Sequence, residues 1–259
     1  MDLLRARDIA LLRADNPGPF SLTGTNSYAV GRDPAWVIDP GPALVAHLDA
    51  LASEVARRGG LAGIALTHDH PDHTEAVAPL LERAGGAPVA AARGDVDIRV
   101  ADGDSVGPLR ALATPGHAPD HLAFVLDDVA FTGDAVLGEG SVFIAPNGGA
   151  LAGYLAGLER LLALPLALLC PGHGPLVDDP AAKLREYIDH RLDREAALVA
   201  ALEHGDRTID ALLDSAWADV PAPLRGAATV TLAAHLDKLA GEGCLPEGVE
   251  RPQIQGSSL

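Results

Sequence analysis

Three histidines and two aspartates lie within the six consecutive positions from His68 to His73, in the segment THDHPDH. His68 and His70 stand two positions apart in an extended segment, so their side chains project to the same side. Asp72 and His73 follow at the entry to a helix, and Pro71 keeps the intervening backbone open. Imidazole nitrogens and carboxylate oxygens are the donors that zinc and similar divalent cations prefer. The spacing therefore predicts a loop that aims four donor groups at a small volume.

Three further donors follow apolar runs: His117 in ATPGHAPDH, Asp134 in AFTGDAVLG and His173 in CPGHGPL. Layered α/β folds usually place their chemistry in such turns after strand ends. His121 has two interpretations. It either supports a metal ligand or contacts substrate, or it is a packed core histidine. Asp69 lies between candidate ligands and is expected to face away from the ions.

Short strand-like runs alternate with helical patterns over the first 180 residues. The expected strands cover residues 8–13, 26–31, 35–39, 63–67, 87–91, 106–115 and 166–170, with a hairpin at 121–134. The expected helices cover 43–58, 74–84 and 150–163. These elements predict an α/β fold in which each candidate donor follows a strand.

After Pro180 the strand-like runs end, and three amphipathic helical patterns cover residues 181–205, 208–217 and 223–243. They predict a small helical, winged-helix-like appendage. We therefore expect a catalytic domain at 1–179, a winged-helix-like domain at 180–250 and a loose tail at 251–259. A chain of 259 residues is long enough for this division.

Composition limits the class of protein. The formal net charge is −17, which disfavours binding to polyanions and acidic membrane surfaces. The only two cysteines, Cys170 and Cys244, are expected to be reduced and buried. The amino terminus lacks an uninterrupted apolar segment, and no apolar run is long enough to cross a bilayer. These features predict a cytoplasmic protein with no membrane partner.

The four stretches that carry the donors resemble the metallo-β-lactamase superfamily of binuclear metal hydrolases. This resemblance implies an αββα sandwich over residues 1–179 and a support for a ligand loop at Asp39, in VIDPG. It also implies one metal held by His68, His70 and His117, a second held by Asp72, His73 and His173, and Asp134 as the bridge. Zinc β-lactamases have cysteine or serine at the bridging position, so antibiotic hydrolysis is not expected. His70 in place of glutamate resembles the hydrolases rather than the oxygen-reducing diiron relatives.

This ligand set implies two Zn²⁺ ions, with iron or manganese as alternatives. One zinc ion alone can lower the pKa of its bound water to about 7, so a hydroxide attacking a carbonyl or phosphorus centre is expected near neutral pH. Asp72 is the expected catalytic residue, because it can orient the nucleophile and pass a proton to the leaving group.

Four segments narrow the resemblance to the lactamase-beta-like-2 group, whose members carry a carboxy-terminal winged-helix-like domain. They are NPGPFSLTGTNSYAVG (16–31), GEGSVF (138–143), YIDHRLDREAAL (187–198) and AAHLDKLAGEG (233–243). An animal member of this group is a single-stranded RNA endonuclease, and bacterial relatives are often labelled hydroxyacylglutathione hydrolases. The resemblance thus leaves two substrate classes open.

Charge favours the small-molecule class. Residues 180–259 hold 8 Lys and Arg against 13 Asp and Glu, whereas phosphate-backbone binding draws on clustered basic residues. Arg185, Arg191 and Arg194 alternate with acidic residues and are expected to form a solvated, ion-paired helix face. The leading hypothesis is hydrolysis of a small thioester or ester, with RNA cleavage second. An iron-dependent sulfur dioxygenase and a non-catalytic regulator are less favoured, and a homodimer stays open.

Overall fold

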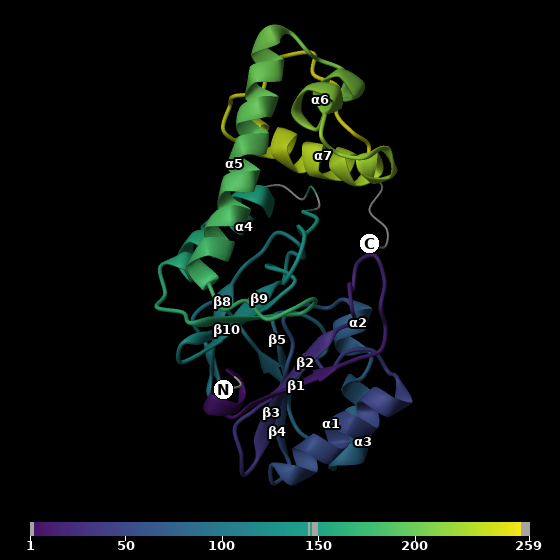
Figure 1. Cartoon of the computed structure of the whole chain (residues 1–259), viewed down its shortest axis with the longest axis vertical. Coiled ribbons are helices and arrows are strands. Elements are labelled where there is room, and N and C mark those ends of the chain that lie inside the picture. The colour runs from purple at the N-terminus through teal and green to yellow at the C-terminus, as the bar shows by residue number, and fades with distance from the viewer. Residues whose placement is uncertain (1–2, 145, 147–149, 255–259) are drawn as a thin grey trace.

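Two β-sheets face each other, and helices cover the outer face of each sheet (Figure 1). The computed structural model describes residues 3–144, 146 and 150–254. The first sheet contains, in spatial order, β1 (Ile9–Arg13), β2 (Asn26–Val30), β3 (Ala35–Ile38), β4 (Leu61–Ala65), β5 (Val89–Ala91) and β6 (Ile98–Arg99). The second contains β11 (Leu168–Pro171), β10 (Val129–Gly133), β9 (Leu122–Leu126), β8 (Leu109–Ala113) and β7 (Ser105–Val106). The predicted αββα sandwich is confirmed.

The direction of the strands brings polar loops together. Strands β3, β4 and β5 run parallel, so their carboxyl ends emerge at one edge of the first sheet. Strands β10 and β11 are also parallel, and their carboxyl ends emerge together from the second sheet. The loops that follow β3, β4, β10 and β11 hold most of the candidate donors and Asp39.

Three apolar layers hold the sandwich together. Tyr28 and Phe131 pack edge to face between the sheets, with ring centroids 5.1 Å apart. Helices α1 (Val45–Arg57), α2 (Pro71–Thr74) and α3 (Val77–Ala84) follow strands of the first sheet, and α1 and α3 cover its outer face. Helix α4 (Ala150–Leu162) covers the second sheet. A short 3₁₀ helix, η1 (Arg5–Arg7), precedes β1.

The C-terminal part is helical, as predicted (Figure 1). It contains α5 (Pro180–His204), α6 (Ile209–Ala216), the 3₁₀ helix η2 (Ala222–Leu224) and α7 (Arg225–Gly241). The amino-terminal half of α5 packs on α4, and its other half shares a separate apolar cluster with α6 and α7. Within the described residues no strand follows β11, so the winged-helix part of the expectation stays a prediction. Residues 255–259 of the expected tail lie outside the described residues.

Several local expectations differ from the structure. The strand expected at 106–115 is split into β7 and β8 by a turn at Gly107, whose φ of 56° lies in the left-handed region that glycine adopts readily. The helix expected at 74–84 begins earlier, at Pro71, and is interrupted before Val77. Cys170 is buried as predicted, but the prediction for Cys244 was wrong, because that thiol is exposed.

The prediction of a solvated face on α5 was wrong for Arg191. Its side chain is only 2% exposed and donates hydrogen bonds to Ser141 Oγ at 2.8 Å and to the Val142 carbonyl at 2.6 Å. Arg194 does form an ion pair, with Asp219. No helix among the described residues is long and apolar enough to span a membrane.

Candidate metal centre and active site

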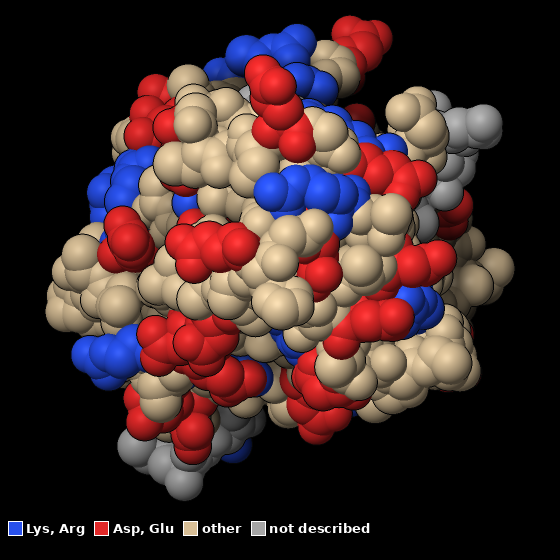
Figure 2. All heavy atoms as spheres, turned by 90° about the horizontal axis from the view of Figure 1, so that it is seen from above, with Lys and Arg blue, Asp and Glu red and all other residues tan. Residues whose placement is uncertain are grey.

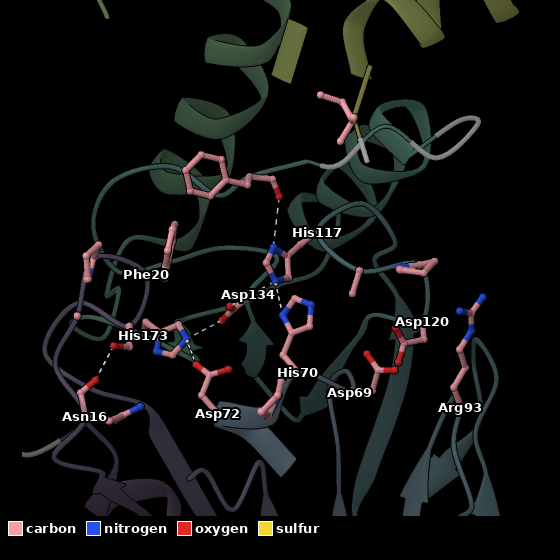
Figure 3. A pocket seen from close by; sticks show the side chains of 18 of the residues that line it. Asn16, Phe20, Asp69, His70, Asp72, Arg93, His117, Asp120, Asp134 and His173 are labelled. Carbon is pink, nitrogen blue, oxygen red and sulfur yellow. Dashed lines mark hydrogen bonds and ion pairs between the residues drawn. The ribbon is translucent and has the colours of Figure 1, made fainter. Parts of the chain in front are cut away.

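The two sheets bring the seven predicted donors to one place (Figure 3). The loop after β4 contributes His68, and His70 follows it in an extended conformation directly before Pro71 begins α2. Asp72 and His73 lie in the single turn of α2. The other donors come from the second sheet, in the loops after β8, β10 and β11; they are His117, Asp134 and His173.

The donor atoms form two clusters with Asp134 between them. Within each of the sets His68–His70–His117, His68–His73–Asp134 and Asp72–His73–His173, the ligand atoms lie within 4.8 Å of one another. Asp134 Oδ2 lies 3.6 Å from His117 Nε2, whereas its Oδ1 lies 3.4 Å from His173 Nε2 and 3.5 Å from His73 Nε2. The two carboxylate oxygens of Asp134 therefore face different clusters. The arrangement matches the predicted ligand sets, and their role in binding metal stays a prediction.

The buried donor atoms have the chemistry that a divalent cation requires. His68 Nε2 and Asp134 Oδ1 are buried without a hydrogen-bond partner, which is costly unless a ligand satisfies them. His73 Nε2 and His173 Nε2 face each other at 3.3 Å, and His117 Nε2 faces His70 Nδ1 at 3.0 Å. Ring nitrogens directed at one another in this way can bind one cation between them once they carry no proton. The residues therefore fit the predicted pair of metal ions.

Asp39 fixes the orientation of the ligand loop. Its carboxylate accepts hydrogen bonds from the Thr67 amide at 2.8 Å, the Thr67 hydroxyl at 2.7 Å and His73 Nδ1 at 2.9 Å. The Thr67 oxygen in turn accepts from His68 Nδ1 at 3.0 Å. This network assigns a proton to Nδ1 of both histidines and leaves each Nε2 as a free donor atom. Asp39 thus supports the loop, as expected.

His121 supports the other side of the centre. It is 1% exposed, and its Nε2 accepts a hydrogen bond from the Asp134 amide at 3.1 Å. Its Nδ1 pairs with Thr114 Oγ1 at 2.8 Å. Burial, reinforced by His117, lowers the pKa of His121 to about 3, so the ring is neutral and can accept. Of the two interpretations of His121, the structure favours a supporting partner for a candidate ligand.

The electrostatics of the centre balance two carboxylates against the imidazoles. Burial lowers the pKa of His68 and His117. Burial also opposes the charge on His173, but the neighbouring carboxylates of Asp134 and Asp72 outweigh it and raise the pKa to about 9. In Asp134 the effect of burial is outweighed by His73 and His173, which hold its pKa well below the usual range. In His73, too, burial is outweighed by Asp134 and Asp39, which raise its pKa well above the usual value. Metal ions binding here therefore replace protons on His73 and His173.

Two glycines make room for these side chains. A Cβ on Gly172 would lie 2.7 Å from Asp134 Oδ1 and 2.8 Å from His73 Cε1. A Cβ on Gly133, whose φ is 46°, would lie 2.5 Å from Thr67 Oγ1 and 2.8 Å from His121 Nε2. Sequence reasoning missed both glycines. Their position, directly beside a candidate donor and at the end of a strand, is a signal that could have identified them.

A cavity of about 600 Å³ opens onto the centre. Its floor includes His70, Asp72, His117, Asp134 and His173. The rest of its lining includes Phe20, Phe143, Ile254, Arg93, Asp69 and Asp120. Asp69 therefore borders the cavity but belongs to none of the donor clusters. Sequence analysis assigned no role to Phe20, Phe143, Ile254 or Arg93.

The comparisons with known proteins agree with this geometry. The sequence model of the metallo-beta-lactamase superfamily matches residues 85–173. A beta-lactamase-like protein 2 homolog of Caenorhabditis elegans is 32% identical, in an alignment that covers 93% of this chain and 85% of that protein. The chain belongs to the metallo-β-lactamase superfamily. This superfamily member is a metal-dependent hydrolase, the class that the sequence predicted.

Two further comparisons extend the match. A protein of Aspergillus chevalieri named atrochrysone carboxyl ACP thioesterase is 35% identical over 80% of this chain and 72% of its own length. The crystal structure of a metallo-beta-lactamase family protein from Thermus thermophilus aligns with a TM-score of 0.71 and 27% identity, covering 91% of this chain and 94% of that one. The likeness to a metallo-β-lactamase family structure therefore includes most of the C-terminal helical part.

Proposed function

We propose that this metallo-β-lactamase superfamily hydrolase binds two zinc ions and hydrolyses a small thioester or ester. The observation that carries the proposal is the pair of donor clusters that share Asp134 and open into a largely apolar cavity. His68, His70 and His117 would hold one ion, and Asp72, His73 and His173 the other. When bound, the ions supply a water of lowered pKa and polarise a carbonyl oxygen.

The residues of the chain position the reactants. Asp72 lines the cavity, its side chain is 36% exposed, and its Oδ2 lies 3.2 Å from His173 Nε2. A hydrogen bond to His173 outweighs burial and lowers the pKa of Asp72, so this carboxylate is ionised at neutral pH. It can therefore orient a water molecule and accept or pass on a proton at its carboxylate oxygen.

The surface supports a small substrate over RNA. Seen from above, over the C-terminal helices, basic side chains are interspersed with acidic ones and form no continuous stripe (Figure 2). Most basic side chains of residues 180–254 are also committed to ion pairs, namely Lys183, Arg194, Arg225, Lys238 and Arg251. The name of the thioesterase relative from Aspergillus chevalieri agrees with a thioester. A substrate similar to hydroxyacylglutathione is one member of this class.

RNA cleavage is the second candidate. It is favoured by the same cavity, in which Phe20 is 63% exposed and Arg93 lies on the rim. An exposed aromatic ring can stack on a base, and an arginine can pair with a phosphate.

A direct assay separates the candidates. Zinc-loaded protein is tested against a panel of thioesters, including lactoylglutathione, and against labelled single-stranded RNA, with metal analysis of the same sample. We expect two zinc ions per chain, thioester turnover and no RNA cleavage. Asp134→Asn and Asp72→Asn should each lower kcat/KM at least ~100-fold, whereas Asp189→Asn, a matched change on the exposed face of α5, should leave it unchanged. Turnover of RNA without thioester hydrolysis would refute the substrate class, and a single iron ion would point to the dioxygenase.

A further inference from the structure

One side of the active-site cavity is an ordered apolar wall. Phe20 lies in a tight turn in which the Gly18 amide donates to the Leu22 carbonyl at 3.2 Å, and Asn16 braces the same loop from within. The ring of Phe20 packs edge to face on Phe143 at 5.7 Å, yet the residue remains 63% exposed. A large aromatic side chain held in a fixed position beside a reaction centre is available to a ligand.

The wall is tied to the metal centre on one side and to α5 on the other. The Phe143 carbonyl accepts a hydrogen bond from His117 Nδ1 at 3.3 Å. The preceding carbonyl, that of Val142, is held by the buried guanidinium of Arg191. Tyr187, one turn earlier on α5, donates to the Gly140 carbonyl at 2.9 Å. The C-terminal helical part thus fixes the segment that carries Phe143.

A third apolar side chain reaches the cavity from the C-terminal segment. Ile254 is half-buried and lines the same cavity as Phe20 and Phe143. The chain just before it is fixed, because the Glu250 amide donates to the Arg207 carbonyl at 2.8 Å and Arg251 pairs with Asp237 on α7 at 3.0 Å. The C-terminal segment therefore adds a third apolar side chain to the lining of the cavity.

The opposite rim is polar. Figure 3 shows Phe20 on one side of the candidate ligands and Arg93 with Asp69 and Asp120 on the other. Arg93 is exposed, and its positive charge acts on the carboxylate of Asp120. The two sides therefore suit chemically different halves of one substrate.

We infer that the acyl half of the substrate is apolar and binds between Phe20, Phe143 and Ile254, while the thiol half lies toward Arg93. This inference rests on the proposed thioester hydrolysis and makes Ile254 a specificity-determining residue. A short polar acyl group such as lactoyl does not cover the apolar side chains, which stay exposed to water, so they add little binding free energy. An acyl chain of about six carbons removes the wall from water and binds better, because each buried methylene contributes favourably.

The test compares acyl groups on one thiol. Acetyl, lactoyl and hexanoyl thioesters of N-acetylcysteamine are hydrolysed by zinc-loaded wild type, Ile254→Ala, Phe20→Ala and Leu224→Ala. Leu224 is the matched control, because it is an aliphatic residue of the C-terminal part that is 54% exposed and lies outside the cavity. We expect wild type to prefer hexanoyl by at least about tenfold in kcat/KM. Ile254→Ala and Phe20→Ala should lower the hexanoyl value about five- to tenfold and the acetyl value less than about twofold.

The outcomes separate this inference from the proposed function. If wild type hydrolyses none of the thioesters, the proposed function fails. If it hydrolyses them without preferring hexanoyl, or if Ile254→Ala and Phe20→Ala change all three substrates equally, the function stands and the apolar acyl site is wrong. Because Phe20 is exposed in a loop, Phe20→Ala is expected to fold and keeps the test decisive even if Ile254→Ala is unstable.

Discussion

Replacing Asp39 with asparagine tests how the metal centre is organised. The change keeps the size of the side chain but turns one accepting oxygen into an NH₂ group. In the native protein Asp39 Oδ2 accepts from both the Thr67 hydroxyl and His73 Nδ1. An NH₂ group at that point must donate, so both partners have to become acceptors. The Thr67 hydroxyl would then donate to His68 Nδ1. The protons of His68 and His73 would move to Nε2 of each ring, which is the atom predicted to bind the ion.

The expected loss of metal affinity follows from the hydrogen bonds that the variant must break. Restoring the metal-binding tautomers costs the bonds from the new amide, at about 0.5–1.5 kcal/mol each. Rotating the amide instead leaves the buried Thr67 N–H unpaired, at about 1–3 kcal/mol. Either route corresponds to about a 10- to 100-fold loss of metal affinity, the range known for residues that orient metal ligands. Because His68 and His73 belong to the ligand sets predicted for different ions, both ions should be affected.

The assay is competition for zinc between the protein and a chelating dye, with both dissociation constants fitted. Asp189→Asn is the control for loss of one surface charge. Chemical unfolding of the metal-free proteins checks that the variant is folded. If Asp39→Asn binds both ions within about twofold of wild type, the tautomer argument is wrong. If only one site weakens, Asp39 orients a ligand of that site alone.

Four other predictions can be checked with the same protein. Gly172→Ala should lower kcat/KM at least ~100-fold in steady-state assays, because its Cβ would displace Asp134, and misplacement by about 1 Å can cost that much. Zinc affinity should rise with pH from 7 to at least about 9, by up to about tenfold per pH unit for each proton displaced, because the ions displace protons from His173, whose pKa is raised to about 9, and from His73, whose pKa is also raised; competition titrations in which the affinity stops rising near pH 6.5 would contradict this. Removing zinc with a chelator should destabilise the protein by about 2.7 kcal/mol for each ion lost, relative to a zinc concentration about 100 times the dissociation constant, measured by urea unfolding. Arg191→Met should cost about 1–3 kcal/mol of unfolding free energy in the same measurement, because the Val142 carbonyl loses a buried donor.

The convergence of the seven side chains could be predicted because much of their spacing is local. Four of the seven lie within six residues, and the other three follow strands whose apolar runs are easy to recognise. The spacing of candidate ligands in a loop after a strand indicates which side chains point to the same side, independently of the rest of the fold. The structure adds what bonds across the fold decide, such as the protons that Asp39 and His121 assign to their neighbours.

The wall of the cavity could not be predicted in this way. Phe20, Phe143 and Ile254 are separated by more than 100 residues along the chain and share no motif, so only the folded chain brings them together. The wrong prediction for Arg191 is different, because the signal was present. Leu184, Tyr187 and Arg191 are spaced by three and four residues and form the buried stripe of α5. The periodicity of the helix was a better guide than the charge of one residue.

The centre is assembled across the two sheets, and hydrogen bonds independent of metal already join them there. The Leu122 amide donates to the Thr67 carbonyl at 2.7 Å, beside His68, and the Asn26 amide donates to the Gly172 carbonyl at 2.7 Å, beside His173. Because these bonds place the donors before any ion binds, binding need not order the loops. Its free energy should then depend mainly on desolvation and on the protons that leave His73 and His173. Changes to Asp39 or His121 should therefore alter metal affinity more than they alter the fold.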